Sequence, residues 1–322
     1  MVNFSYTIVG TGAIGGFYGS RLQQAGSKVN FLLNSDYQHV SHNGLLVESP
    51  EGNFTLPQVN AYRDVSEIPP SDVVVVALKT TNNHLLSKLL PPLIKDTTIV
   101  LVLQNGLGIE EEVAKIVGTQ RVIGGMCFIC SNKIGPGHIR HLDYGTVTIA
   151  EYLPNYQPVG ITQKMRQLAA DFESAGIEVL LSEDLLLSRW QKLVWNIPYN
   201  GLSVVLDATT EQLMADGEMR SLIEQIMQEV VLGAKTCNRL IPESFIEKML
   251  VYTTKMKPYR TSMKIDYDLV RPLEIEAIFS NPLKIVAQAG VYLPRIRMLD
   301  QQLKFLKTNN RSNNSLGKGT NC

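Results

Sequence analysis

The sequence contains little cysteine and no excess of charge of either sign. Only four of its 322 residues are cysteine, too few for a fold held together by disulfides, so we expect a cytoplasmic protein in a reducing compartment. Lysine and arginine together number 30, and so do aspartate and glutamate. A chain without surplus positive charge lacks the basic surface that phosphate backbones require, which argues against nucleic acid as a partner.

Long hydrophobic runs are also missing. The longest covers six residues, 73–78, whereas a membrane-spanning helix needs about 20. The first ten residues, MVNFSYTIVG, contain no basic segment of the kind that opens a secretory signal. The chain does contain 44% hydrophobic and 19% charged residues, the balance of a globular protein with a buried core. At about 150 residues per domain, its length favours two domains.

Short apolar runs alternate with helical patterns in the first part of the chain. The runs are rich in Val, Ile and Leu, as expected for strands buried on both faces of a parallel sheet; they are 5–9, 29–33, 73–78 and 98–103. Helical spacing occupies segments between them, such as 15–25 and 83–93. This alternation predicts an α/β fold with a doubly wound, Rossmann-type sheet in a domain of residues 1–181.

Later in this part, residues 137–142 and 146–151 are expected to form a hairpin that turns at Asp143-Tyr144-Gly145. Beyond residue 181 the strand signals fade, and three segments have helical spacing: 185–205, 211–240 and 273–290. We therefore expect an all-helical domain over residues 182–307. The tail 308–322 lacks apolar side chains that could be buried and is expected to be disordered.

A glycine signature follows the first expected strand. Gly10, Gly12 and Gly15 form G-x-G-x-x-G, with Ala13 and Ile14 inside it, where a strand gives way to a helix. The first glycine permits a tight turn, the second lets the backbone approach a pyrophosphate, and the third allows close packing of helix on strand. The helix N-terminus adds N–H groups and the positive end of its dipole. In this context the motif predicts a dinucleotide-binding loop.

Three further residues stand where ligands bind in such sheets, beyond the carboxyl ends of the strands. Asn34 follows the second expected strand, where an acid selects NAD and a base selects NADP; it is neither, and Asp36 comes two residues later, so spacing leaves the choice open. Lys79 follows residues 73–78 and could neutralise cofactor phosphate or be a solvated strand end. Asn105 follows residues 98–103 and could orient the nicotinamide or the substrate, or belong to a plain turn.

Polar side chains recur every four residues in an otherwise apolar helical segment. Lys192, Asn196 and Asn200 stand at i, i+4 and i+8 and therefore share one stripe of the helix. A cation and two amides among Leu and Trp residues are costly to bury unless they line a polar cavity. The alternative is a solvated stripe beside a core-facing one. Pro198 breaks the hydrogen-bond ladder of this segment and favours a kink.

With these motifs in their order, the sequence resembles the ketopantoate reductase family (2-dehydropantoate 2-reductases) over nearly its whole length. The segments that carry the resemblance are Gly10–Gly15, Leu78-Lys79-Thr80, Leu103-Gln104-Asn105-Gly106, Lys192-x₃-Asn196-x₃-Asn200, Thr261-Ser262-Met263 with Asp266, and Leu273-Glu274-Ile275-Glu276. The resemblance implies a Rossmann domain followed by a helical domain. It also implies reduction of ketopantoate, a branched 2-keto acid, to pantoate with NADPH in the pathway to pantothenate and coenzyme A, with no metal.

The same resemblance implies roles for individual residues. Lys192 matches the family's catalytic lysine, the expected general acid, and Glu274 matches a glutamate at the reacting oxygen. Lys79 matches a lysine that contacts the 2′-phosphate of NADP. Four residues match substrate-binding positions, the first of them also at the cofactor: Asn105, Asn196, Asn200 and Ser262.

The position that bears on cofactor choice departs from the family pattern. Asn34 stands where members usually have an arginine, so the preference for NADPH rests on Lys79 rather than on a bidentate partner. Two alternative functions are a related NAD(P)-dependent reductase of another 2-keto acid or an imine, and a non-catalytic dinucleotide-binding regulator. The intact catalytic set argues against the regulator, because a sensor needs no proton donor. The expected assembly is a monomer or a homodimer.

Overall fold

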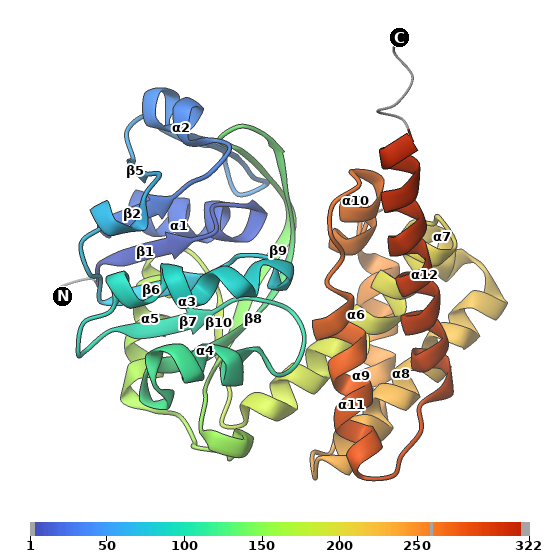
Figure 1. Ribbon diagram of the computed structural model, residues 1–322. Helices are drawn as coiled ribbons and strands as arrows, with labels where there is room; N and C mark the ends of the chain where they lie inside the picture. Colours follow the sequence, from blue (N-terminus) through green and yellow to red (C-terminus); the bar gives the residue numbers. More distant parts are fainter. Residues whose placement is uncertain (1–3, 258–259, 317–322) are drawn as a thin grey trace. The chain divides into compact units, whose positions relative to one another are not determined.

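The computed structural model describes residues 4–257 and 260–316. They form two compact units (Figure 1). One contains the chain up to Gln104 together with Gly108–Ser188, and the other contains Asn105–Leu107 together with the chain from Arg189 onward. The segment Asn105–Leu107 therefore belongs to a different unit from the residues on either side of it.

The first unit is built on a mixed sheet, which has ten strands within the described residues. The strands are β1 (Tyr6–Val9), β2 (Val29–Leu32), β3 (Leu45–Glu48), β4 (Phe54–Leu56), β5 (Asn60–Tyr62), β6 (Val73–Val76), β7 (Ile99–Val102), β8 (Val122–Gly135), β9 (His138–Glu151) and β10 (Val179–Leu181). The α-helices are α1 (Ala13–Gln24), α2 (Tyr37–Asn43), α3 (Leu86–Leu89), α4 (Ile109–Val117) and α5 (Gln163–Ser174).

Parallel neighbours in this sheet follow the order β5-β2-β1-β6-β7-β8. Apart from β3 and β4, which pair elsewhere, this is the 3-2-1-4-5-6 order of dinucleotide-binding α/β sheets. The predicted doubly wound sheet is confirmed. The order reverses between β1 and β6, whose last residues Val9 and Val76 are paired. Ligands bind outside the carboxyl ends of the strands at such a reversal, so the residues after Val9 and Val76 lie at the ligand-binding edge.

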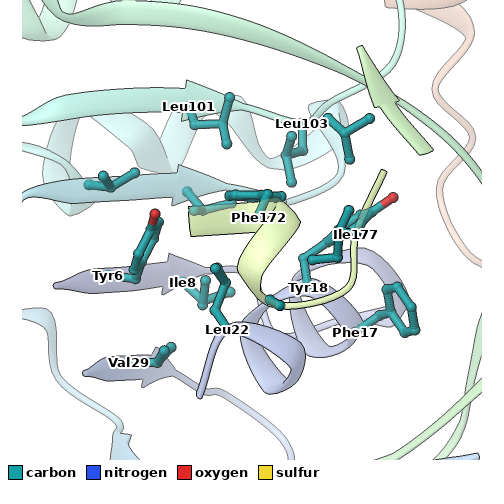
Figure 2. Close-up of a cluster of buried hydrophobic side chains, with 14 of the residues drawn as sticks. Tyr6, Ile8, Phe17, Tyr18, Leu22, Val29, Leu101, Leu103, Phe172 and Ile177 are labelled. Atoms are coloured by element: carbon teal, nitrogen blue, oxygen red, sulfur yellow. The ribbon is translucent and has the colours of Figure 1, made fainter. Parts of the chain in front are cut away.

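One face of the sheet packs against α1 and α5. Side chains from these helices and from the central strands form a single buried cluster, part of which is drawn in Figure 2: Tyr6, Ile8, Phe17, Tyr18, Leu22, Val29, Leu101, Leu103, Phe172 and Ile177. Alternate residues of a strand face the same side, so Tyr6 and Ile8 both point into this cluster. Burial of the apolar face of α1 holds its N-terminus, and the glycine loop before it, against β1.

β8 and β9 form one long antiparallel hairpin whose turn lies at residues 136–137. The hairpin expected to turn at 143–145 is therefore wrong. Asp143-Tyr144-Gly145 instead lie inside β9, where the pairing skips Gly145 between the partners of Phe128 and Ile129. Tyr144 and Gly145 have φ of 61° and 142°. A β-bulge uses the same positive-φ residues as a tight turn, so the two cannot be distinguished from this sequence.

The second unit is helical. Its helices are α6 (Leu185–Val205), which begins in the first unit, α7 (Thr210–Ala215), α8 (Gly217–Thr236), α9 (Glu243–Lys255), α10 (Ser262–Asp268), the π-helical turn η6 (Glu276–Ser280), α11 (Asn281–Gln288) and α12 (Pro294–Leu316). Trp190 of α6 is fully buried and contacts α8 at Gly233, where a Cβ atom would lie 2.8 Å from the indole ring. α6 continues across Pro198 as one helix.

Two expected helices are interrupted, and a third contains a π-helical turn. Segment 211–240 is divided between α7 and α8, because the Asp216 carboxylate caps α8 by accepting from the Met219 N–H at 2.9 Å. Segment 273–290 is helical as expected over residues 275–288, because η6 continues into α11 without a break and the junction residues Ser280 and Asn281 keep helical φ and ψ; Pro282 stands in the first turn of α11. Segment 83–93 forms only short turns around α3. Polar caps and prolines inside an apolar periodicity mark such breaks.

The predicted disorder of the tail is wrong for residues 308–316, because α12 extends to Leu316; residues 317–322 lie outside the described residues. Once a helix has formed, each added residue gains one hydrogen bond at little cost, so even a polar sequence can prolong it. Within the described chain, no helix combines the length and the apolar character needed to cross a membrane.

Candidate active site

The glycine loop connects β1 to α1 at the edge where the strand order reverses. Gly10 has φ +102°, and a Cβ atom there would lie 2.5 Å from the backbone N of Leu78. A Cβ atom on Gly15 would lie 2.3 Å from the carbonyl oxygen of Gly10 and 2.7 Å from Cγ2 of Ile8. These two glycines therefore allow the turn and the contact between helix and strand that other residues would prevent.

Gly12 differs from its two neighbours in the motif. It is the N-cap of α1, has ordinary extended geometry (φ −92°, ψ −154°), and a Cβ atom placed on it would meet nothing within 4 Å. Its lack of a side chain is thus not required by packing in the protein. The first turn of α1, which contains Ala13 and Ile14, carries no acidic residue. An open backbone at a helix N-terminus fits a pyrophosphate, which needs close approach and N–H donors.

The ends of β2 and β6 lie beside this loop. The hydroxyl of Thr11 donates to the carbonyl oxygen of Leu32, the last residue of β2, at 3.1 Å. Asn34 follows two residues later and is exposed. Lys79 is half-buried and is the N-cap of the 3₁₀ turn η2 (Thr80–Leu85), directly after the residue that packs on Gly10. The predicted cofactor residues of the glycine loop, together with Asn34 and Lys79, thus lie along one edge of the first unit, whereas Asn105 belongs to the second unit.

The short segment Asn105–Leu107 is fixed to the second unit. Gly106 has φ +106°, and a Cβ atom there would lie 2.4 Å from the carbonyl oxygen of Ala277. That same oxygen accepts a hydrogen bond from the Leu107 N–H at 3.0 Å. The side chain of Asn281 donates to the Leu107 carbonyl at 2.8 Å. These contacts hold the loop that carries Asn105 against η6 and the start of α11.

The α6 stripe approaches this loop. The amide of Asn196 is buried and donates to Oδ1 of Asn105 at 3.3 Å, which brings together two residues 91 positions apart in the sequence. Lys192, one turn earlier, is half-buried, and its Nζ lies 5.8 Å from the ring centroid of Trp195, within the range of a cation–π interaction. The indole N–H of Trp195 donates to the hydroxyl of Thr253 at 3.0 Å, so the ring is held in place.

α10 is fixed to the last turns of α6. Oδ1 of Asn200 accepts from the Met263 N–H at 3.4 Å. Ser203 and Thr261 share a hydrogen bond of 2.8 Å between their hydroxyl groups, both fully buried. Thr261 is also the N-cap of α10, because its hydroxyl accepts from the Lys264 N–H at 3.2 Å. Ser262 is the first residue of that helix, so these bonds place it next to Asn200.

Glu274 is buried, with 5% of its surface exposed, and lies two residues before η6. Its carbonyl oxygen accepts from the Ile278 N–H at 3.2 Å, so the segment enters the helical turn directly. π-helical turns are rare and occur often at functional sites. The contacts of Gly106 and Leu107 with Ala277 therefore connect the segment that contains Glu274 to the loop that contains Asn105.

The sequence patterns did not identify the residues that support this arrangement. Ser203 and Thr253 are small, buried polar side chains whose partners, Thr261 and Trp195, lie 58 residues away, and no local sequence pattern predicts such pairs. Lys264 was equally inconspicuous. Its side chain is only 4% exposed and pairs with Asp207 at 2.7 Å and with Asp268; burial lowers its pKa, but these two carboxylates outweigh burial and the pKa lies above its usual value.

The strand order, the glycine loop and the helical unit define a class: an oxidoreductase with a Rossmann-type dinucleotide-binding unit and a separate helical unit. Family models describe both parts of the chain. Residues 6–154 match "Ketopantoate reductase PanE/ApbA", and residues 184–307 match "Ketopantoate reductase PanE/ApbA C terminal".

Individual relatives agree with these models. A 2-dehydropantoate 2-reductase of Nostoc sp. is 63% identical over 307 residues, which cover 95% of this chain and 96% of that protein. The crystal structure of 2-dehydropantoate 2-reductase from Geobacter metallireducens superposes with a TM-score of 0.89 at 42% identity, covering 93% of this chain and 99% of the other. That of the Methylococcus capsulatus enzyme gives 0.84 at 31% identity, covering 95% and 97%. The chain belongs to the ketopantoate reductase family, whose members are NADPH-dependent enzymes.

Proposed function

We propose that this protein reduces ketopantoate to pantoate with NADPH, in the supply of pantothenate and coenzyme A, and that Lys192 is its general acid. The observation that carries the assignment of residues is the bond between Asn196 and Asn105. It joins the helix of Lys192 to Asn105, which comes shortly after β7 in the sequence and belongs to the helical unit. Lys192 and Asn196 are one helical turn apart and share one stripe of α6.

NADPH, when bound, supplies the hydride that reduces the keto carbon. Gly12, Ala13 and Ile14 offer the open backbone that its pyrophosphate needs, with Gly10 and Gly15 shaping the turn. Lys79 supplies a cation for the 2′-phosphate, while Asn34 contributes only a neutral side chain there. Asn105 lies at the junction of cofactor and substrate.

Lys192 donates a hydrogen bond to the keto oxygen, stabilises the negative charge that develops on it, and transfers the proton. General acid catalysis of this kind contributes about 10²–10⁴-fold. Glu274 is an acceptor for the ammonium group and for the new hydroxyl group. Asn196, Asn200 and Ser262 provide neutral donors for the rest of the keto acid, which keeps the pocket from carrying too much positive charge.

The substrate assignment is tested by following the absorbance of NADPH and NADH with a panel of acids: ketopantoate, its deoxy analogue 3,3-dimethyl-2-oxobutanoate, pyruvate and an aromatic 2-keto acid. We expect ketopantoate to have the highest kcat/KM by at least about tenfold, because a site built to bond a hydroxyl group rejects the analogue that lacks it. Faster turnover of another acid, or of an imine formed from one, would assign the protein to a neighbouring activity. No oxidation with any acid would indicate a regulator.

We also propose a division of labour along the chain: dinucleotide binding by residues 1–181 and catalysis by residues 182–307. The protein acts in the cytoplasm, as a monomer or a homodimer. The compartment is supported by the low cysteine content of the sequence, four residues in 322. Size-exclusion chromatography with light scattering distinguishes the two assemblies.

A further inference from the structure

The loop directly after β2 contains an acidic residue and no basic one. Asn34, Ser35 and Asp36 follow the strand, and only Asp36 is charged. In Rossmann-type sheets, an acid in this region bonds the ribose hydroxyl groups and favours NAD over NADP. Yet the chain belongs to an NADPH-dependent family, so the charge of Asp36 has to be accommodated.

Asp36 is turned away from solvent and is occupied by protein donors. It is only 6% exposed, whereas Asn34 and Ser35 are exposed. Its Oδ2 atom lies 2.5 Å from Nζ of Lys133 and accepts from the Gly137 N–H at 3.0 Å. Its Oδ1 atom accepts from the hydroxyl of Ser35 at 3.0 Å. Both carboxylate oxygens are therefore engaged without any ligand.

Two of these donors, Lys133 and the Gly137 N–H, come from the β8–β9 hairpin, which also contacts the start of α1. The hydroxyl of Ser131 donates to the carbonyl oxygen of Ala13 at 3.3 Å. Ser131 and Lys133 are two residues apart on β8 and so point to the same side of the strand. One side of β8 thus contacts both the first turn after the glycine loop and the loop after β2. The Lys133–Asp36 pair lies at the nucleotide-binding edge of the first unit.

The pair contains a charged carboxylate. Burial raises the pKa of Asp36, but the hydrogen bonds from Lys133 and from the Gly137 N–H outweigh it, and the pKa lies below its usual value. The Asp36 side chain is consequently ionised at neutral pH. Lys133 supplies the compensating charge, and 27% of its side chain remains exposed.

We propose that Lys133 determines cofactor specificity by neutralising Asp36, so that a strand end with an acid and no arginine accepts the 2′-phosphate of NADPH. This inference rests on nucleotide binding at the glycine loop. Lys133 acts through Asp36 and does not itself contact the phosphate. Without Lys133, the ionised carboxylate of Asp36 repels the 2′-phosphate of the cofactor. Binding of a cofactor that has only hydroxyl groups on this ribose is unaffected.

The test measures binding of two cofactor fragments to the full-length protein by calorimetry, without catalysis. 2′,5′-ADP carries the 2′-phosphate, and 5′-AMP does not. In Lys133→Met, we expect the affinity for 2′,5′-ADP to fall about tenfold while that for 5′-AMP is retained, which is the effect of one uncompensated charge in a partly solvated site. In Asp36→Asn/Lys133→Met, which removes both charges, we expect the wild-type ratio of affinities to return.

The matched control is Lys95→Met. Lys95 also pairs with an aspartate of the first unit, Asp72, at 2.6 Å, but Asp72 immediately precedes β6 and is therefore at its amino end. Its loss should leave both affinities unchanged. An unchanged ratio in folded Lys133→Met overturns the proposal. A double variant as weak for 2′,5′-ADP as Lys133→Met also overturns it, because Lys133 would then contact the phosphate directly. If wild-type protein binds neither fragment, the nucleotide site itself is misassigned.

Discussion

Lys192 is the side chain on which the proposed chemistry depends most. In Lys192→Ala, we expect kcat for ketopantoate to fall by about 10²–10⁴-fold, the usual contribution of a general acid. Binding of NADPH, followed by its fluorescence, should be retained, and so should the melting temperature, because the lysine is only half-buried.

Gln191→Ala is the matched control for this change. Gln191 is the preceding residue of α6 and is also half-buried, but it lies off the stripe that contains Asn196 and Asn200. Its kcat should stay within about twofold of wild type, as for a surface substitution away from the site. Near-normal turnover in Lys192→Ala would remove the lysine from the mechanism.

Glycines of the same motif are expected to respond differently to the same substitution. Gly15→Ala places a Cβ atom 2.3 Å from the Gly10 carbonyl, and such overpacking costs about 1–3 kcal/mol of stability. Gly12→Ala meets nothing within 4 Å, so the free energy of unfolding should be retained while affinity for NADPH falls. Urea unfolding and NADPH titration measure the two effects separately. If Gly12→Ala binds NADPH like wild type, the pyrophosphate does not approach that residue.

At the scale of elements, α10 offers a test of how Ser262 is positioned. Thr261→Val keeps the shape of the side chain but removes the cap of α10 and the bond to Ser203. We expect KM for the keto acid to rise about fivefold with little change in KM for NADPH, because such a bond is worth about 1 kcal/mol. Thr261→Ser retains the hydroxyl group and should restore the wild-type KM.

Thr209→Val distinguishes positioning from general destabilisation. Thr209 caps α7 with the same chemistry, accepting from the Gln212 N–H at 3.3 Å, but its contacts do not lead to Ser262. Its loss should lower stability without raising KM for the keto acid. Equal KM values for the two valine variants at temperatures where both are folded would contradict the assigned role of α10.

The elements also show what the sequence could predict. The central strands and the 21-residue helix α6 were predictable, because buried parallel strands are continuous in Val, Ile and Leu and residues 185–205 have helical spacing. The glycine loop was predictable because its geometry admits few other residues. β3, β4 and β5 were not predicted, because β4 and β5 contain no fully buried residue and β3 is buried only at alternate positions, so none has the continuous apolar run of the central strands.

The residues of the candidate site were likewise only partly predictable from the sequence. Lys192, Asn196 and Asn200 were identified by their spacing on one helix, whereas Ser262 and Glu274 came only from resemblance to a family. The bond from Asn196 to Asn105 and the pairs formed by Asp36 and Thr261 depend on long-range packing. Local periodicity contains no information about which distant element a polar side chain will meet, so these contacts required the structure.

At the scale of the whole molecule, acid stability depends on carboxylates that hold strands together. Asp72 accepts hydrogen bonds from the N–H and hydroxyl of Ser5 at 2.9 and 2.7 Å and from Lys95 at 2.6 Å. Burial raises its pKa, but these donors outweigh burial and lower the pKa to about 2. The pKa is depressed in the folded state, so this stabilisation is present above the unfolded value near 3.8 and is lost as pH falls toward 2.

Asp72→Asn should therefore be less stable than wild type at pH 7, and the difference should shrink between about pH 4 and pH 2. Urea midpoints measured across this range provide the comparison. If the difference in urea midpoint between the two proteins stays constant with pH, the negative charge of Asp72 does not contribute to stability.

The tripeptide Asn105–Leu107 sets a limit on how the protein can be divided. It packs with the helical unit but is encoded between two stretches of the α/β unit, so no single continuous gene fragment encodes the helical unit whole. A fragment beginning at Arg189 would leave the Ala277 carbonyl and the Asn281 amide without the partners they have in the intact chain. Domain exchange between relatives, or rearrangement of the gene by circular permutation, succeeds only if the tripeptide Asn105–Leu107 is kept together with the helical unit.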